Sequence, residues 1–154
     1  MNRLYVLLAV MLVMAGALFA GQEALAKVLT GTPGEDTLVG TDHYDRLTAR
    51  AGEDSLKARS GADHLNGGPG QDFLKGNSGN DHLWGSRGND KIHPGAGDDK
   101  VYAGYGDDLI YARDKEDVDY IDCGPGFDKV ETIHRDDETL SNCERALGPR
   151  KGHI

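Results

Sequence analysis

A nine-residue period runs through the middle of the chain and constrains its fold more than any other feature. From residue 31 to residue 111 the sequence divides without a gap into nine blocks, among them GGPGQDFLK at 67–75 and GNSGNDHLW at 76–84. The fourth place is Gly in eight of the nine blocks, with His43 as the exception, the sixth is always Asp and the eighth is always aliphatic. A disordered Gly- and Asp-rich tract has no reason to keep three places in phase, so the pattern predicts stacked repeats.

Each recurring place has a physical interpretation. Glycine at place four fits a tight turn with positive φ, where a Cβ would clash. Places seven to nine predict a very short strand, in which side chains alternate between the two faces, so that the aliphatic eighth place points inward. The seventh and ninth places then point mostly to solvent, and they include Arg46, Lys57, Lys75, Lys91 and Lys100.

One aliphatic residue in every nine cannot form a core alone, but many stacked turns can. The pattern therefore predicts an all-β fold, a parallel β-roll with two strands and two turns in each revolution of eighteen residues. The sixth-place aspartates fall into two rows at the edges of this roll. One row contains Asp36, Asp54, Asp72, Asp90 and Asp108, and the other contains Asp45, Asp63, Asp81 and Asp99.

Rows of aspartates need cations. Carboxylates separated by one strand spacing, ~4.8 Å, repel each other, and the carbonyl groups of the turns lack partners. Ca²⁺ answers both needs, because it accepts six to eight oxygen ligands in flexible geometry and combines carboxylates with backbone carbonyls. Mg²⁺ requires a tighter octahedron, and Zn²⁺ prefers His or Cys, neither of which recurs at a ligand position.

The blocks also resemble a known family. GGPGQD at 67–72, GNSGND at 76–81 and GSRGND at 85–90 are similar to the RTX, or haemolysin-type, calcium-binding nonapeptide repeat, G-G-x-G-x-D-x-U-x. The resemblance implies Ca²⁺ between successive turns on each edge, with carboxylates from the nine aspartates and carbonyls from the turns that begin at Gly67, Gly76 and Gly85. Adjacent aspartates in the two rows form four pairs and three pairs, so we expect at most seven ions.

The period slips after Asp108. Asp119 and Asp128 restore the Asp-x-aliphatic pattern, but Asp119 follows Asp108 by eleven residues, which indicates a two-residue insertion. We expect residues 112–143 to contain degenerate repeats and a C-terminal cap, followed by a tail over residues 144–154. The even cysteine count suggests a disulfide between Cys123 and Cys143. A pair of metal-binding thiols is the alternative, although no C-x-x-C spacing supports it.

The N-terminus predicts export. A short basic start precedes an apolar stretch from Leu4 to Ala20, and Ala24-Leu25-Ala26 fits a small-x-small cleavage site. Residues 1–26 are therefore interpreted as a Sec-type signal peptide cleaved after Ala26, with residues 27–30 as a short lead-in. An uncleaved membrane anchor is the alternative. With cleavage, the protein is expected to be secreted.

Composition and motifs limit the function classes. A net charge of −9 argues against nucleic acid as a partner. There is no H-E-x-x-H or G-x-S-x-G motif, so no catalytic residue is assigned and a secreted hydrolase or toxin fragment is the least favoured interpretation. The sequence favours a secreted Ca²⁺-binding protein without catalytic activity, whose protein or glycan partner it does not specify.

Exposed aromatic residues provide the alternative function. Trp84 and Tyr102 are eighteen residues apart in the ninth place and are expected to stack, while Phe73 and Tyr111 lie on the other face. Such residues can bind sugars or a partner, as in a Ca²⁺-dependent adhesion module, or they can form a cross-strand ladder that stiffens the sheet. His64 and His82 share the seventh place and are expected to stack at the surface rather than bind a metal.

Overall fold

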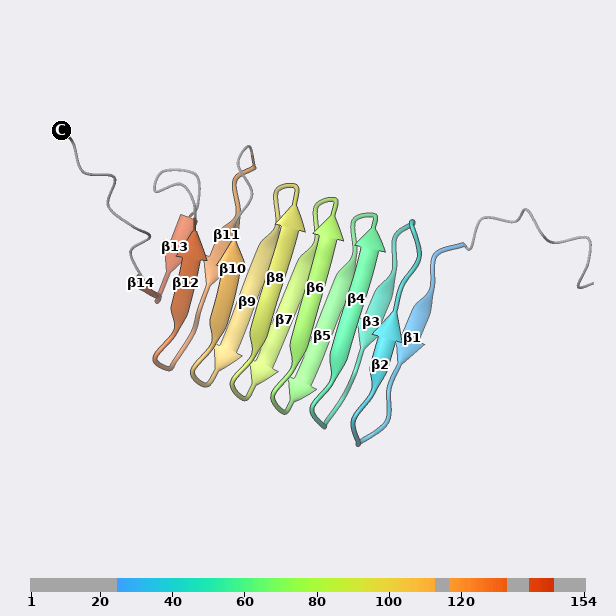
Figure 1. Cartoon of the computed structure of the whole chain (residues 1–154), viewed down its shortest axis with the longest axis horizontal. Helices are drawn as coiled ribbons and strands as arrows, with labels where there is room; N and C mark the ends of the chain where they lie inside the picture. Colours follow the sequence, from blue (N-terminus) through green and yellow to red (C-terminus); the bar gives the residue numbers. More distant parts are fainter. Residues whose placement is uncertain (1–24, 113–116, 133–138, 146–154) are drawn as a thin grey trace, which may run out of the picture.

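Two parallel β-sheets face each other across a thin interior (Figure 1). The computed structural model describes residues 25–112, 117–132 and 139–145. Odd-numbered strands form one sheet, in the order β1-β3-β5-β7-β9-β11-β13, and even-numbered strands form the other, from β14 to β2. We call them sheet A and sheet B. Because the chain alternates between the sheets, each strand pairs with the strand two places further along, which is the predicted parallel β-roll.

The strands have the following bounds. Sheet A contains β1 (Val28–Thr30), β3 (Arg46–Thr48), β5 (His64–Pro69), β7 (His82–Arg87), β9 (Lys100–Tyr105), β11 (Tyr120–Asp122) and β13 (Thr139–Ser141). Sheet B contains β2 (Thr37–Val39), β4 (Ser55–Ser60), β6 (Phe73–Ser78), β8 (Lys91–Ala96), β10 (Leu109–Ala112), β12 (Lys129–Thr132) and β14 (Glu144–Arg145).

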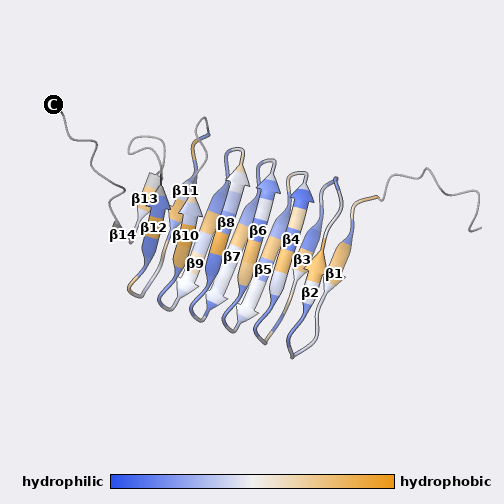
Figure 2. Ribbon diagram, in the orientation of Figure 1, coloured by the Kyte–Doolittle hydropathy of each residue, from blue (hydrophilic) through white to orange (hydrophobic). Residues whose placement is uncertain are grey.

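The aliphatic eighth place fills the interior, as predicted. In sheet A, Leu47 is in register with Leu65, which is in register with Leu83, and these side chains are fully buried. Sheet B contains the equivalent column through Leu56, Leu74 and Ile92. The hydrophobic residues consequently form a band across the middle of both sheets (Figure 2). The eighteen-residue offset places like residues beside like, so one aliphatic side chain per repeat is enough for a continuous core.

The strands are longer than the predicted three residues. Strands β4 to β9 each contain six residues, because they continue through places one to three of the next block. The first place is the reason, since it adds a second inward-facing column of small residues. Ala49, Ala58 and Ala103 are fully buried there, as is Gly67 in β5. The interior therefore combines one large and one small residue from each repeat.

The C-terminal turns continue the roll across the predicted insertion. Tyr120 of β11 is in register with Lys100 of β9, an offset of twenty residues instead of eighteen. The disulfide between Cys123 and Cys143 is present, with the two Cα atoms 5.2 Å apart. It connects the residue after β11 to the segment between β13 and β14, so it fastens the last turn to the one before it.

At the N-terminus, the lead-in contains β1, which pairs with β3. Nearly all of the predicted signal peptide, and residues 146–154 of the predicted tail, lie outside the described residues. The described part of the chain contains no helix long and apolar enough to cross a membrane.

Candidate metal centre

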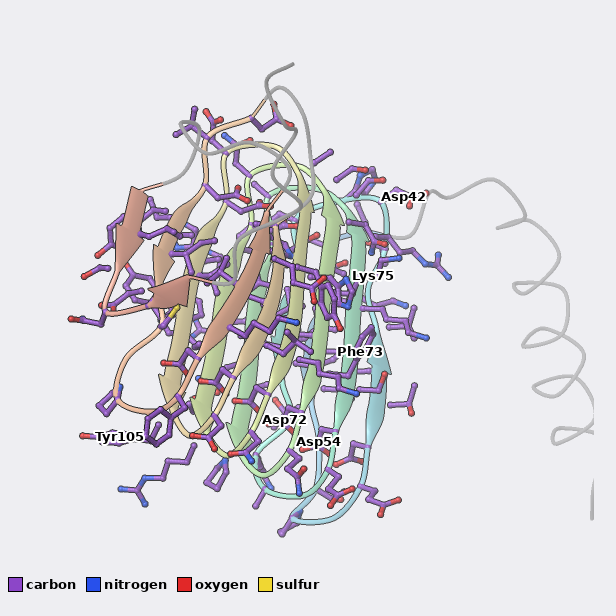
Figure 3. The ribbon with its side chains drawn as sticks, turned by 60° about the vertical axis from the view of Figure 1, so that its left-hand side comes forward. Asp42, Asp54, Asp72, Phe73, Lys75 and Tyr105 are labelled. Atoms are coloured by element: carbon purple, nitrogen blue, oxygen red, sulfur yellow. A yellow bond between two sulfur atoms is a disulfide. The ribbon has the colours of Figure 1, made fainter. Side chains whose placement is uncertain are left out.

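The sixth-place aspartates line the two edges of the roll, where the chain turns from one sheet to the other. Asp54 and Asp72 lie at one edge, and Asp42 marks the other (Figure 3). Within each row, the N–H of every sixth-place aspartate donates to the Oδ1 atom of the aspartate one full revolution of the roll further along. The N–H of Asp63 donates to Asp81 at 2.8 Å, and that of Asp72 donates to Asp90 at 2.8 Å. These bonds fix the carboxylates between successive turns.

The second carboxylate oxygen, Oδ2, does not accept such a hydrogen bond in most of the row. The Oδ2 atoms of six aspartates are buried and accept no hydrogen bond; they belong to Asp54, Asp63, Asp72, Asp81, Asp90 and Asp108. A buried anionic oxygen without a partner is strongly unfavourable in a folded protein. Two rows of such atoms therefore indicate a cationic ligand that would complete them.

Backbone carbonyl groups of the turns point into the same gaps. A Cβ built on Gly70 would lie 1.6 Å from the carbonyl oxygen of Gly52, which holds the fourth place one revolution earlier. A Cβ on Gly68 would lie 1.7 Å from the carbonyl oxygen of Arg50, at the second place. In the described part of the chain, no hydrogen bond within the turns ends on the carbonyl of Gly52. A Cβ on Gly76 would lie 2.3 Å from both the Oδ2 atom of Asp81 and the carbonyl oxygen of Pro94. Carboxylate and carbonyl oxygens therefore lie close together at this edge, which is the donor set that Ca²⁺ accepts.

Two left-handed residues per turn produce this arrangement. Place four has positive φ in Gly52, Gly61 and Gly70 and in the later repeats, as predicted. Place two is left-handed as well, even where it is not glycine: Arg50 and Arg59 both have a φ of 95°. The sequence pattern does not indicate this second position, because several different residues occupy it.

Burial shifts the titration of the carboxyl groups. Desolvation raises the pKa of Asp81 and of Asp90 to about 7, from an ordinary value of 3.8. It raises those of Asp63, Asp72 and Asp108 to about 6. In each case the hydrogen bond from the preceding aspartate N–H lowers the pKa, and neighbouring carboxylates in the row raise it. The rows are therefore places where negative charge is costly until a cation neutralises it.

The first two turns differ from all the later ones. Thr41 donates to the carboxylate of Asp45 through both its N–H and its hydroxyl, and Thr32 makes the equivalent bonds to Asp36. Gly34 and His43, at place four, do not have positive φ, which corrects the expectation that every turn uses the same glycine geometry. Threonine at place two thus donates to the second carboxylate oxygen, which accepts no hydrogen bond in the six aspartates named above.

Comparison with protein families agrees with this geometry. The model of the RTX calcium-binding nonapeptide repeat matches the chain four times, over residues 30–65, 57–92, 66–101 and 92–118. The chain belongs to this family. Neither the curated proteins nor the solved structures provided a match. Membership implies that this RTX chain binds Ca²⁺, as the resemblance indicated.

The RTX structure places the predicted residues as follows. All nine sixth-place aspartates lie in the two rows, but only Asp36 and Asp45 have their second oxygen bonded by threonine. The N–H of Asp99 donates to Asp119, and that of Asp108 donates to Asp128, so both rows continue for one more turn. The Asp-x-aliphatic pattern could have identified these two as row members.

The glycines predicted to supply carbonyl ligands lie next to the aspartate carboxylates. Gly67, Gly76 and Gly85 lie in strands β5, β6 and β7 and are buried. A Cβ on any of them would lie 2.3 Å from the Oδ2 atom of the aspartate in the same repeat, for example Asp72 beside Gly67. The absence of a side chain at these positions therefore makes room for the carboxylate.

The predicted aromatic contacts also form. Trp84 stacks on Tyr102 with ring centroids 6.0 Å apart, and His64 stacks on His82 at 4.9 Å. These residues lie on the outer face of sheet A, where His64 and His82 directly follow the row members Asp63 and Asp81. On sheet B, Phe73 is in register with Lys91, which is in register with Leu109.

Proposed function

We propose that this RTX chain is a secreted Ca²⁺-binding protein without catalytic activity, in which Ca²⁺ between successive turns holds the β-roll folded. The observation that carries the proposal is the set of six buried aspartates, three or more turns deep in the roll, whose Oδ2 atoms accept no hydrogen bond: Asp54, Asp63, Asp72, Asp81, Asp90 and Asp108. A bound dication would supply their missing partner and would neutralise pairs of carboxylates one turn apart. Ca²⁺ would be a structural ligand, with no bond of a substrate made or broken.

The ligands would be the sixth-place carboxylates with turn carbonyls from the same gaps. At one edge we assign Asp54, Asp72, Asp90 and Asp108, and at the other Asp63, Asp81 and Asp99. Asp36 and Asp45 are weaker candidates, because Thr32 and Thr41 already donate to their second oxygens. The adjacent aspartates assigned here form three pairs and two pairs, which account for five of the at most seven ions expected from the repeats.

The donor set favours Ca²⁺ over other metals. In the residues that the structure describes, no three His, Cys, Asp or Glu side chains come together in a cluster that could hold a metal. A site between two turns therefore combines at most two carboxylates with carbonyl oxygens. Ca²⁺ accepts this mixture, whereas Zn²⁺ prefers nitrogen and sulfur ligands and Mg²⁺ retains its own waters.

This arrangement would couple folding to the Ca²⁺ concentration. Without a cation, the buried carboxylates oppose the folded state, and with Ca²⁺ the binding free energy becomes folding free energy. The disulfide supports an oxidising compartment, as outside the cell, where Ca²⁺ is also abundant. Folding would then follow export.

The test is a Ca²⁺ titration of the purified protein followed by far-UV circular dichroism, with Mg²⁺ as the control ion. We expect a cooperative gain of β signal with Ca²⁺ alone. Asp81→Asn should weaken the response, while Asp42→Asn, which removes an exposed carboxylate at the same edge, should leave it unchanged. A β signal that is indifferent to both Ca²⁺ and chelator would contradict the proposal.

A further inference from the structure

A shallow groove lies on the outer face of sheet A. It has a volume of about 190 Å³ and crosses strands β3, β5 and β7. Its polar lining consists of Arg46, Thr48, His64 and Asn66, and the Trp84 indole forms its aromatic boundary. The groove exists because Thr48 and Asn66 are short residues in the same column as the large Trp84.

The aromatic boundary of the groove is held in place on both sides. Trp84 lies 5.6 Å from the ring of His64 and stacks on Tyr102 with an interplanar angle of 9°. Tyr44 in turn contacts His64 edge-on, with centroids 5.5 Å apart. Ring contacts on both sides restrict the indole, so a flat ligand would meet a preorganised surface.

The face around the groove is cationic, although the whole chain carries a charge of −9. Arg46 and Lys100 stand in one column, with His64 and His82 between them. None of the outward residues of β3, β5, β7 and β9 at places seven and nine is acidic; they are Arg46, Thr48, His64, Asn66, His82, Trp84, Lys100 and Tyr102. Within the described residues, neither Arg46 nor Lys100 forms an ion pair.

We propose that this groove binds an acidic saccharide, with a sugar ring against the Trp84 indole and a uronate carboxylate on the Arg46 guanidinium. One face of a pyranose presents C–H groups, which pack on aromatic rings. Arginine binds carboxylate with two parallel hydrogen bonds, and the Asn66 amide offers both a donor and an acceptor to sugar hydroxyls.

The mixture of neutral and charged groups distinguishes a saccharide from other anions. A nucleic acid or acidic peptide would be expected to require a denser basic patch, since its affinity comes from many neutralised charges. Here Arg46 and Lys100 are the two charged residues of the outward columns, and the uncharged hydrogen-bonding groups of Thr48 and Asn66 lie beside Arg46 in the groove. This arrangement suits a polymer in which charged units alternate with uncharged ones.

The single tryptophan of the chain is Trp84, so its fluorescence reports on the groove directly. The protein is titrated, in saturating Ca²⁺, with hyaluronan and heparosan hexasaccharides, and then with the same oligosaccharides after reduction of their carboxyl groups to alcohols. We expect a saturable fluorescence change with the native oligosaccharides and about tenfold weaker binding of the reduced ones, because a charge-assisted hydrogen bond is lost.

Variants locate the site. Arg46→Gln should weaken binding about tenfold. Lys75→Gln should not alter it, because Lys75 is an exposed residue of β6 in sheet B. Trp84→Ala, followed by calorimetry, should abolish binding while circular dichroism still shows the Ca²⁺ response.

Polyglutamate is titrated in the same way as the acidic-peptide control. Three results would overturn the proposal: no response to either native oligosaccharide, equal affinity for the reduced forms, or equal affinity for polyglutamate. The last would assign the face to acidic peptides instead. None of these results bears on the Ca²⁺ sites, which are tested by titration with the metal alone.

Discussion

In the absence of metal, lowering the pH should stabilise this protein, which is the reverse of ordinary acid denaturation. The perturbation is a change from pH 8 to pH 5 in the presence of a chelator. Burial raises the pKa of Asp81 and Asp90 to about 7 in the folded roll, and those of Asp63, Asp72 and Asp108 to about 6. In the unfolded chain these groups have a pKa of about 3.9.

The sign of the effect follows from proton linkage. A carboxyl group whose pKa is raised by folding binds its proton more tightly in the folded state. Its contribution to stability is fully present below the unfolded pKa and is lost as the pH rises through the folded pKa. Between pH 8 and pH 5, the roll therefore takes up protons that the unfolded chain does not, and the folded state gains.

The magnitude can be worked out from the same values. One pKa unit corresponds to about 1.4 kcal/mol, so Asp81 could gain at most about 2.7 kcal/mol over this range. Solvent screening and coupling within the row reduce this to about 1 kcal/mol for each carboxyl group. Five such groups would add roughly 5 kcal/mol, which is comparable with the whole stability of a small domain.

The assay is urea unfolding followed by far-UV circular dichroism at four pH values in chelator. We expect the urea midpoint to rise as the pH falls from 8 to 5. The double variant Asp81→Asn/Asp90→Asn mimics two protonated carboxyls, so it should be more stable than the natural protein in chelator at pH 8 and should bind Ca²⁺ less well. A midpoint that stays constant or falls over this range would refute the argument from buried carboxylates.

Three further predictions concern the backbone and the disulfide. Gly70→Ala should destabilise the Ca²⁺-bound roll by at least about 2 kcal/mol, because its Cβ would lie 1.6 Å from a carbonyl oxygen of the preceding turn; Gly34→Ala, where the nearest atom is 3.9 Å away, is the matched control, and urea unfolding compares the two. Arg59→Gly should raise the urea midpoint by relieving a non-glycine residue with a φ of 95°, and an unchanged or lower midpoint would count against this strain. Replacing Cys123 and Cys143 by serine should cost about 2–4 kcal/mol and should increase hydrogen exchange in β11 and β13 before the central strands; uniform exchange would contradict the role given to the disulfide.

The nine-residue period predicted most of the fold because it combines register, strand direction and burial in one pattern. Leu65 and Leu83 had to be neighbours once each revolution contained eighteen residues, and the same offset placed Trp84 beside Tyr102. The aspartate rows followed in the same way. No comparable signal identified the left-handed second place, because Arg59 and other non-glycine residues occupy it.

Two other features depended on contacts that a consensus pattern does not contain. The separate geometry of the first two turns comes from Thr32 and Thr41, whose hydroxyl groups reach carboxylates four residues away. The extra inward column depends on small side chains such as Ala58, which do not recur as one residue type at the first place and so give no repeat signal. In both cases local hydrogen bonding or packing determined the outcome.

The aspartate hydrogen bonds give the assembly of the roll a direction. Each aspartate N–H is bonded by the carboxylate of the turn that follows, so adding a turn completes the one before it. The first two turns additionally satisfy their own carboxylates through threonine. A chain that leaves a ribosome or a narrow channel with its N-terminus first would thus present its turns in the order in which each can be finished. The roll would therefore grow from its N-terminal end toward its C-terminal end, where the disulfide between Cys123 and Cys143 joins the final turns.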